Sequence, residues 1–404
     1  MKQTWRWFGP NDPTSIDAVV QAGVEGVVSS LHHVNSGEVW SMEEIAKRQQ
    51  EIAHFTNGTP SGLEWDVVES LVVSEDIKKQ SGDFKKHLEN YRTSLKHLAE
   101  SGITTVCYNF MPVIDWTRTD LAHNLPSGGT AMRFDIVDFA VFDIFLLERP
   151  GAREDFSPEL LESAERRHTE MPEAKKSALV QNIVAGLPGS NEKLTLAQVR
   201  EHLRQYDHIS REQLARHLTD FLSEIIPAAE RLGIRMCCHP DDPPFALMGL
   251  PRVTSTASDY RRFLDMIDSP ANGVTFCSGS FGARHDNDLL DLIDGFADKI
   301  HFVHLRAVRR DTDSVPCSFF EDEHLAGDMD MVAVMAALLH EEARRREEGR
   351  ADHQIPMRPD HGQDIIDDLK REGGQPGYPV IGRLKGLAEL RGVMKALQHV
   401  EYGL

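Results

Sequence analysis

Short apolar runs recur along the chain, each with the length and the β-branched or apolar content of a buried strand. Eight runs are predicted as strands, at residues 3–8, 25–31, 64–70, 103–110, 234–239, 273–278, 300–305 and 355–359. Amphipathic helical patterns fall at about 14–22, 43–55, 77–100, 211–232, 255–268, 285–296, 328–347 and 385–399. This alternation predicts an α/β fold, a (β/α)8 barrel of the TIM type, with an open doubly wound sheet as the alternative.

Two segments exceed what a minimal barrel needs. Residues 113–210 separate the fourth strand from the helix before the fifth, and they include an aromatic-rich stretch and a charged helical stretch. We expect a mainly helical insertion within a single domain of residues 1–404, serving either as a cap over the catalytic face or as a contact between subunits. Residues 307–327 follow the seventh strand and are predicted as a long loop, of the kind that often forms an active-site lid.

The composition and net charge of the chain argue against several classes of function. The 404 residues are 40% hydrophobic and 27% charged, as in ordinary soluble globular proteins. The net charge of −20 argues against partners such as nucleic acid or an anionic membrane, which a basic face would bind. No apolar run reaches the ~20 residues of a membrane-spanning helix, and the first ten residues lack the apolar centre of a signal peptide. Five cysteines without a paired framework favour reduced thiols and a cytoplasmic location.

Four consecutive predicted strands each end in a side chain that can bind a metal ion: His239, Cys277, His304 and Asp360. The stretches between them are long enough for a helical crossover each time, as parallel strands require. The C-terminal ends of parallel barrel strands meet at one face, so these side chains are expected to converge. Imidazole, thiolate and carboxylate together suit Mn²⁺, Fe²⁺, Co²⁺ or Zn²⁺, and a single thiolate is atypical of a structural zinc site.

The chain also resembles a known family. The segments TWRWFGP, CCHPDDPP, LPRVTST, FCSGS, VHLR, MRPDHG and PGYPVIGRLKGLAELRGV are similar to those of mannonate dehydratases of hexuronate degradation, and the similarity runs nearly end to end. It implies a TIM-type barrel, a Mn²⁺ (or Fe²⁺) cofactor and the dehydration of D-mannonate to 2-keto-3-deoxy-D-gluconate. It also implies that His239, Cys277, His304 and Asp360 hold the metal.

That reaction removes the C2 proton and the C3 hydroxyl of a sugar acid, so it needs a base and an acid beside the metal. His361 follows the ligand Asp360 and is the first acid/base candidate, because an imidazole titrates near neutral pH. Tyr378, in a Pro-Gly-Tyr turn, is the second. The sequence leaves open which is acid and which is base, and His361 could instead be a hydrogen-bonding partner of the metal carboxylate.

The substrate is an anionic polyol, so its binding calls for a cation and hydroxyl-matching groups. Arg306 lies two residues beyond His304 and is expected to share its face and reach the carboxylate. Arg358 is a weaker candidate, because it could point down into the barrel. From the first half of the chain, Trp7, His32 and Asn109 are expected to line the pocket.

A second set of residues is expected to support the ligands. Asp241 and Asp242 could orient His239 through its other ring nitrogen, or could cap the proline-rich turn around them. Glu69 is placed in the same supporting set. Cys237, by strand alternation, shares the face of His239, and it is expected to fill the core.

Other functions fit parts of this pattern. A divalent-metal sugar isomerase or epimerase would use a similar barrel, but Cys277 counts against it, and the acidic charge counts against a nuclease. A non-catalytic metal-binding protein would not explain His361 and Arg306 at the same barrel face. The expected partners are a small-molecule substrate and further copies of the chain, as a homodimer or higher homo-oligomer.

Overall fold

Eight parallel strands close into a barrel in the computed structural model, which describes residues 1–114, 116–184 and 194–402. Around the barrel the order is β1-β12-β9-β8-β7-β4-β3-β2. The bounds are β1 (Lys2–Arg6), β2 (Gly26–Ser29), β3 (Trp65–Glu69), β4 (Thr105–Tyr108), β7 (Arg235–Cys238), β8 (Asn272–Cys277), β9 (Ile300–Leu305) and β12 (Pro356–Pro359). All eight predicted strands and the closed barrel are confirmed, so the eight C-terminal strand ends meet at one face.

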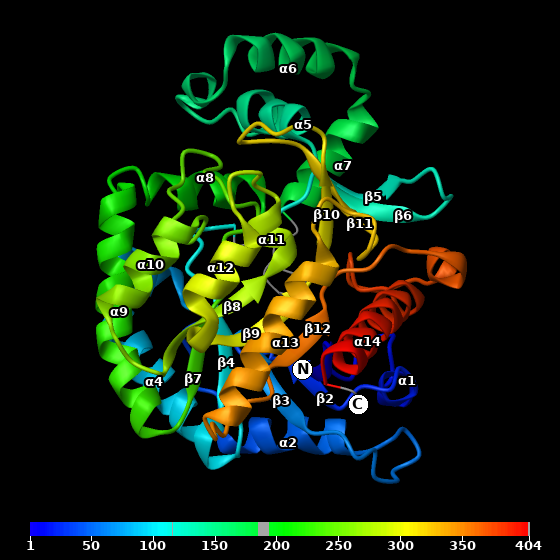
Figure 1. The fold of residues 1–404 in the computed structure, drawn as a ribbon. Helices are drawn as coiled ribbons and strands as arrows, with labels where there is room; N and C mark the ends of the chain where they lie inside the picture. The colour runs from blue at the N-terminus through cyan, green and yellow to red at the C-terminus, as the bar shows by residue number, and fades with distance from the viewer. Residues whose placement is uncertain (115, 185–193, 403–404) are drawn as a thin grey trace.

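Helices surround this barrel (Figure 1). They include α1 (Ile16–Gln21), α2 (Met42–Ala53), α3 (Glu75–Lys79), α4 (Phe84–Glu100), α9 (Arg211–Arg231), α10 (Ala257–Met266), α11 (Ser278–Gly282), α12 (Leu289–Phe296), α13 (Met331–Glu347) and α14 (Val380–Tyr402). The single helix predicted at 77–100 is divided into α3 and α4, because Gln80 ends α3 in the left-handed conformation at φ 53°. None of the helices in the described part of the chain is both long and apolar enough to cross a membrane.

The interior of the barrel holds a small apolar layer, separate from the main core between strands and helices. Val28, Val67, Cys107, Cys237 and Phe302 form this layer, and all are fully buried. The adjacent Cys238 belongs to the outer core, so the alternation predicted for this cysteine pair is confirmed. The layer closes the barrel below the C-terminal strand ends, and a site built there has a solid floor.

The insertion between β4 and α9 is mainly helical, as expected. It contains α5 (Ile136–Val141), a π-helix (Phe142–Leu146), a 3-10 helix (Ala152–Asp155), α6 (Pro158–Glu170), α7 (Glu173–Val184) and α8 (Leu196–Arg204). In Figure 1, α5 and α6 lie at the top of the molecule, beyond the barrel end where α11 follows β8. Part of the insertion, residues 185–193, lies outside the described residues.

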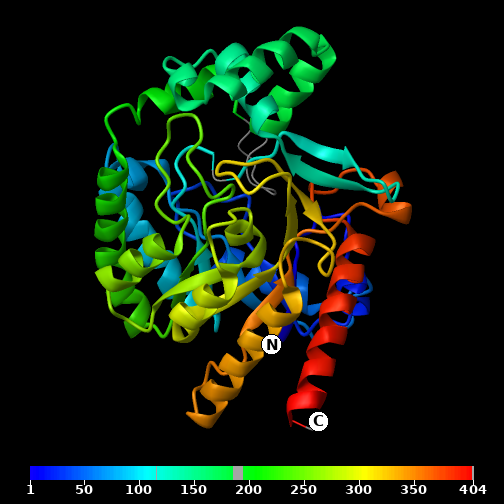
Figure 2. The same ribbon diagram turned by 45° about the horizontal axis from the view of Figure 1, so that its top comes forward.

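A small second sheet was not predicted. The insertion begins with a hairpin of β5 (Asp120–Asn124) and β6 (Thr130–Phe134). The prediction of a loop at 307–327 is wrong, because this segment forms β10 (Ala307–Arg310) and β11 (Phe319–Asp322). The four strands pair antiparallel in the order β10-β11-β6-β5 (Figures 1 and 2). Stacking of Phe134 on Phe319, with ring centroids 5.8 Å apart, fixes the junction between the two hairpins.

Candidate metal centre and active site

Three of the four predicted ligands converge at the C-terminal face of the barrel. His239 follows β7, Cys277 ends β8 and His304 lies near the end of β9, and their ligand atoms all lie within 4.8 Å of one another. Cys277 is also the residue before α11, where its Sγ accepts a hydrogen bond from the backbone N–H of Ser280 at 3.4 Å. Such a contact stabilises a thiolate. Adjacent strands therefore bring two imidazoles and one thiol to a common point.

The hydrogen bonds of the two imidazoles show which nitrogens face this point. His239 Nδ1 lies 2.7 Å from the carbonyl oxygen of Pro240, so it carries the proton and leaves a lone pair on Nε2. His304 Nε2 lies 3.4 Å from Oε2 of Glu69, which favours a lone pair on Nδ1. These two lone-pair nitrogens face each other at 3.1 Å. Two acceptors at this distance repel unless a cation lies between them, so the residues fit a bound metal ion.

The pKa shifts of His239 and Glu69 are consistent with metal binding at this point. Burial lowers the pKa of His239, which favours the neutral imidazole that a metal requires. Glu69 is only 4% exposed. Burial alone would raise the pKa of Glu69, but the charges of Arg358, Arg6 and His304 hold it well below its usual value. Glu69 therefore stays ionised beside His304, and its role in supporting a metal ligand stays a prediction.

Asp360, the fourth predicted ligand, lies beside the three but is bound to arginines in this structure. Its Oδ2 is 3.7 Å from Cys277 Sγ and 3.9 Å from His304 Nδ1. Oδ1 is 2.5 Å from Nη1 of Arg358, and Oδ2 is 3.3 Å from Nη1 of Arg306. Burial opposes its ionisation, but Arg358 and the neighbouring cations hold the pKa of Asp360 well below its usual value. Ligation by Asp360 stays a prediction.

A network of buried charges surrounds the three ligands. Four arginines and four carboxylates take part, and none is more than 4% exposed: Arg6, Arg118, Arg306, Arg358, Glu69, Asp242, Glu321 and Asp360. Their formal charges cancel. Buried charges are tolerated when they are paired and hydrogen-bonded, which is the case here. The acidic surface of the protein therefore encloses an electrically balanced site.

One half of the network is centred on Glu69. Arg6 donates from Nη1 to Oε1 at 2.8 Å, and Arg358 donates to both carboxylate oxygens at 2.7 and 2.9 Å. The suggestion that Arg358 points down into the barrel is wrong, because it faces His304 in the strand register and lines the cavity above the floor.

The other half is centred on Asp242 and Glu321. Arg118 donates two hydrogen bonds to Asp242, of 2.8 and 3.2 Å, and two to Glu321, of 2.7 and 3.2 Å. Arg306 donates to Asp242 at 2.7 Å and lies 3.2 Å from Glu321. Burial would raise the pKa of Glu321, but Arg306, His361 and Arg118 lower it to about 2. Both carboxylates are therefore ionised at neutral pH.

The expectation that Asp241 or Asp242 orients His239 is wrong. The second nitrogen of His239 contacts the Pro240 carbonyl instead. Asp242 binds the two arginines, while Asp241 accepts hydrogen bonds from Thr254 N at 2.9 Å and Ser255 Oγ at 2.7 Å. The carboxylate of Asp241 thus ties the turn after β7 to the segment before α10 and does not cap the proline-rich turn itself. A backbone carbonyl one residue away satisfies the imidazole at lower cost than a buried carboxylate would.

The two acid/base candidates lie together beside the candidate metal ligands. The rings of His361 and Tyr378 meet edge to face with centroids 5.1 Å apart. His361 Nδ1 lies 3.2 Å from Oε1 of Glu321, and its Nε2 lies 3.7 Å from Oδ1 of Asp360. The hydroxyl of Tyr378 accepts a hydrogen bond from Arg6 at 3.2 Å. Burial raises the pKa of Tyr378 despite the nearby arginines, so the phenol is neutral in this state.

These side chains enclose a small cavity of about 30 Å³, well below the ~300–1,000 Å³ typical of ligand pockets. Its lining combines ligands, acid/base candidates and predicted substrate contacts: Arg6, Glu69, Ser70, Cys107, Asn109, Met111, Trp116, His239, Asp242, Arg306, Arg358, Asp360, His361 and Tyr378. The predicted placements of Arg306 and Asn109 in the pocket agree with this lining.

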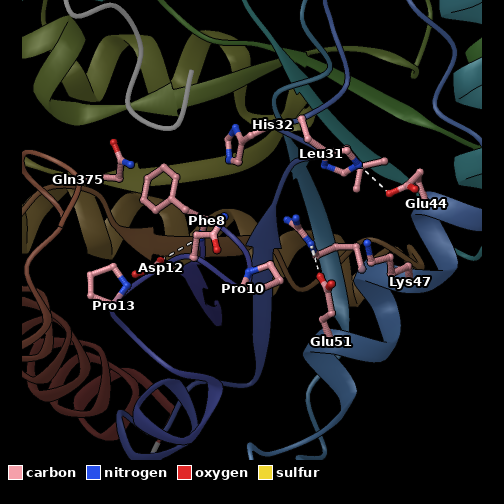
Figure 3. A pocket seen from close by; sticks show the side chains of 13 residues that line it. Phe8, Pro10, Asp12, Pro13, Leu31, His32, Glu44, Lys47, Glu51 and Gln375 are labelled. Atoms are coloured by element: carbon pink, nitrogen blue, oxygen red, sulfur yellow. Dashed lines mark hydrogen bonds and ion pairs between the residues drawn. The ribbon is translucent and has the colours of Figure 1, made fainter. Parts of the chain in front are cut away.

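Trp7 and His32 are not among the described residues that line this cavity. Trp7 donates its indole N–H to the carbonyl of Thr14 at 2.9 Å. His32 stacks on Phe8, with centroids 5.6 Å apart, in a neighbouring pocket shown in Figure 3. Phe8 also meets the ring of Tyr378 edge to face at 4.9 Å, so this pocket adjoins the site. Direct substrate contact by Trp7 and His32 stays a prediction that this geometry does not favour.

Four site residues were missed in the sequence. Arg6 could have been found, because it precedes Trp7 and alternation places only one of the two inside the barrel. Trp116 and Arg118 belong to the insertion, and Glu321 belongs to the segment that was taken for a loop. No periodic pattern links those positions to the barrel, so only the folded structure reveals that they reach the site.

Comparison with known proteins agrees with the resemblance. The D-mannonate dehydratase (UxuA) family matches residues 1–402. Mannonate dehydratase 1 of Agrobacterium fabrum (strain C58 / ATCC 33970) is 60% identical over 404 residues, covering 100% of this chain and 99% of that protein, and mannonate dehydratase of Rhizobium meliloti (strain 1021) is 59% identical over the same shares. The crystal structure of mannonate dehydratase from Streptococcus suis serotype 2 is 31% identical and superposes with a TM-score of 0.75, covering 99% of this chain and 94% of that one. The chain belongs to the D-mannonate dehydratase family.

Proposed function

We propose that this protein is a hydro-lyase that converts D-mannonate to 2-keto-3-deoxy-D-gluconate and water, with Mn²⁺ or Fe²⁺ as its cofactor. The observation that carries the proposal is full-length identity of 60% to a mannonate dehydratase. The site adds support, because the three-ligand cluster shares His239 with a cavity that is lined by arginines and by two acid/base candidates. The expected cytoplasmic location and homo-oligomeric state stay predictions, as does the role of the insertion as cap or contact.

His239, Cys277 and His304 would hold the ion, with Asp360 as the fourth ligand once a cation competes with Arg306 and Arg358 for its oxygens. Nitrogen, sulfur and oxygen donors together favour a borderline divalent ion such as Mn²⁺ or Fe²⁺. When bound, the ion supplies Lewis-acid stabilisation of the negative charge that develops next to the substrate carboxylate.

Arg306 is our candidate for binding the substrate carboxylate. Two of its nitrogens face acidic partners, with Nη1 bound to Asp242 and Nε near Glu321. Its Nη2, which is buried, donates to no described atom. A guanidinium fixed by two carboxylates and still presenting a free donor is pre-organised for an anion.

His361 and Tyr378 would share the proton transfers. Glu321 lies near Nδ1 of His361 and orients the ring, so Nε2 is the nitrogen that can exchange a proton with substrate. Tyr378 accepts a hydrogen bond from Arg6, which leaves its own O–H free to donate and would stabilise a phenolate afterwards. One of them takes the C2 proton and the other protonates the departing C3 hydroxyl.

The test is an assay of metal-stripped protein with D-mannonate, with and without added Mn²⁺ or Fe²⁺. Metal-dependent formation of a 2-keto-3-deoxy acid is the expected result. Absence of product with either metal would refute the substrate assignment and direct the search to other sugar acids, and then to isomerisation. Product at the same rate without metal would refute the cofactor assignment alone.

A further inference from the structure

A residue of the insertion that lines the cavity carries a buried donor without a described partner. Trp116 lines the cavity and is 4% exposed. Its indole Nε1 is buried and makes no hydrogen bond to any described atom. An indole nitrogen can only donate, so the group it lacks is an acceptor. Buried polar groups in native proteins nearly always have a hydrogen-bond partner. An unpaired buried donor beside a ligand site is therefore expected to bind an acceptor of the ligand.

The indole is held firmly in this orientation. The guanidinium of Arg118 lies 5.0 Å from the Trp116 ring centroid, and Arg118 is fixed in turn by Asp242 and Glu321. On another side, the ring of His361 meets Trp116 near a right angle, with centroids 6.2 Å apart. The side chain therefore cannot easily turn to find a partner within the protein, and its donor is pre-organised.

Two other tryptophans differ from Trp116 in the surroundings of the indole N–H group. Trp65 satisfies its indole N–H with the carbonyl oxygen of Val67 at 2.9 Å. Trp5 also lacks a described partner, but the guanidinium of Arg383 lies 3.9 Å from its ring centroid and Trp5 does not line the cavity. Only the unpartnered donor of Trp116, of these three, faces a space where a ligand can supply an acceptor.

We infer that Trp116 binds a hydroxyl oxygen of the substrate through its indole N–H, and so makes the insertion part of the substrate-recognition site. This inference rests on the proposed function, because it takes a polyhydroxylated acid as the ligand. The substrate carboxylate has Arg306, whose free Nη2 is the stronger, charged donor. The indole N–H of Trp116 is a neutral donor, so it matches a neutral hydroxyl group of the substrate better than it matches the carboxylate.

The experiment compares Trp116→Phe with wild type and with the control Trp65→Phe. The control removes an indole N–H that is bonded within the protein, away from the cavity. Each protein, in its metal-loaded form, is assayed for kcat and KM with D-mannonate. Binding is then measured for 3-, 4-, 5- and 6-deoxy-D-mannonate, each lacking one hydroxyl, as KM for analogues that are turned over and as an inhibition constant for the 3-deoxy compound, which lacks the leaving hydroxyl.

Loss of one neutral hydrogen bond should raise KM about tenfold in Trp116→Phe and leave kcat within about threefold. One deoxy analogue should bind wild type and Trp65→Phe about tenfold more weakly than the other analogues. In Trp116→Phe that difference should disappear, because the partner donor is gone. A purely structural role would instead weaken all analogues equally.

Equal weakening of all four analogues, or a KM unchanged from the control, would overturn the inference. If Trp116→Phe does not fold, as judged by its melting temperature, Trp116→Leu, which also lacks a donor, takes its place with the same criteria. Wild type that fails to turn over D-mannonate would overturn the proposed function, and this inference with it. Wild type that is active while Trp116→Phe matches Trp65→Phe would overturn this inference alone.

Discussion

Replacing Arg118 with alanine should destabilise the protein strongly, although Arg118 is not a predicted ligand or acid/base group. The side chain is fully buried and makes hydrogen bonds to both Asp242 and Glu321. Removing one partner of a buried ion pair costs about 3–5 kcal/mol, because it leaves charge uncompensated. Unfolding entropy is ~2.1 cal/mol/K per residue, or ~0.85 kcal/mol/K for 404 residues. The melting temperature should therefore fall by about 4–6 °C.

Differential scanning calorimetry of the metal-loaded protein measures this shift. The matched control is Arg92→Ala, which removes a 2.7 Å ion pair with Glu224 in which the side chains are 37% and 57% exposed. An exposed pair contributes ~0–1 kcal/mol, so the control should melt within about 1 °C of wild type. If Arg118→Ala also melts within 1 °C of wild type, Arg306 alone compensates Asp242 and Glu321, and the reasoning from burial is refuted.

Three further outcomes are expected. Cys277→Ser should weaken Mn²⁺ binding by at least ~10–100-fold, measured as metal retained after dialysis; undiminished metal and activity would remove Cys277 from the site. His361→Asn should retain metal but lower kcat by ~10²–10⁴-fold, and wild-type rates would exclude an acid/base role. Burial lowers the pKa of His301 to about 3. In the unfolded chain this histidine has its ordinary pKa of ~6.5. As the pH falls from 6.5 toward 3, the unfolded chain therefore binds a proton that the folded protein does not bind. The free energy of unfolding falls as a result, by ~2 kcal/mol at pH 5. Urea unfolding of His301→Asn at pH 5 and 7 should show a smaller difference than wild type, and an equal difference would contradict this.

The barrel and the convergence of the candidate ligands could be predicted because both follow from local patterns. Strand length and crossover spacing identify eight strands, and the end of a strand gives the position of a ligand such as Cys277. The contacts of Arg118 with Glu321 join two segments without such a pattern, so their convergence depends on tertiary packing. Arg6 was missed for a different reason. At a strand end, adjacent residues face opposite ways, and the hydrophobic pattern did not show which of them faces the barrel interior.

The four-stranded sheet joins two connections of the barrel, the one after β4 and the one after β9, into a single structural unit. In many barrels, single loops at the catalytic face can be exchanged to change specificity while the scaffold stays the same. Here β6 of one connection pairs with β11 of another, so transplanting either alone would leave an unpaired strand edge exposed. Engineering of a new substrate range would have to move both connections together, as one graft, with Trp116, which lines the cavity, and with Arg118 and Glu321, which belong to the charge network around it.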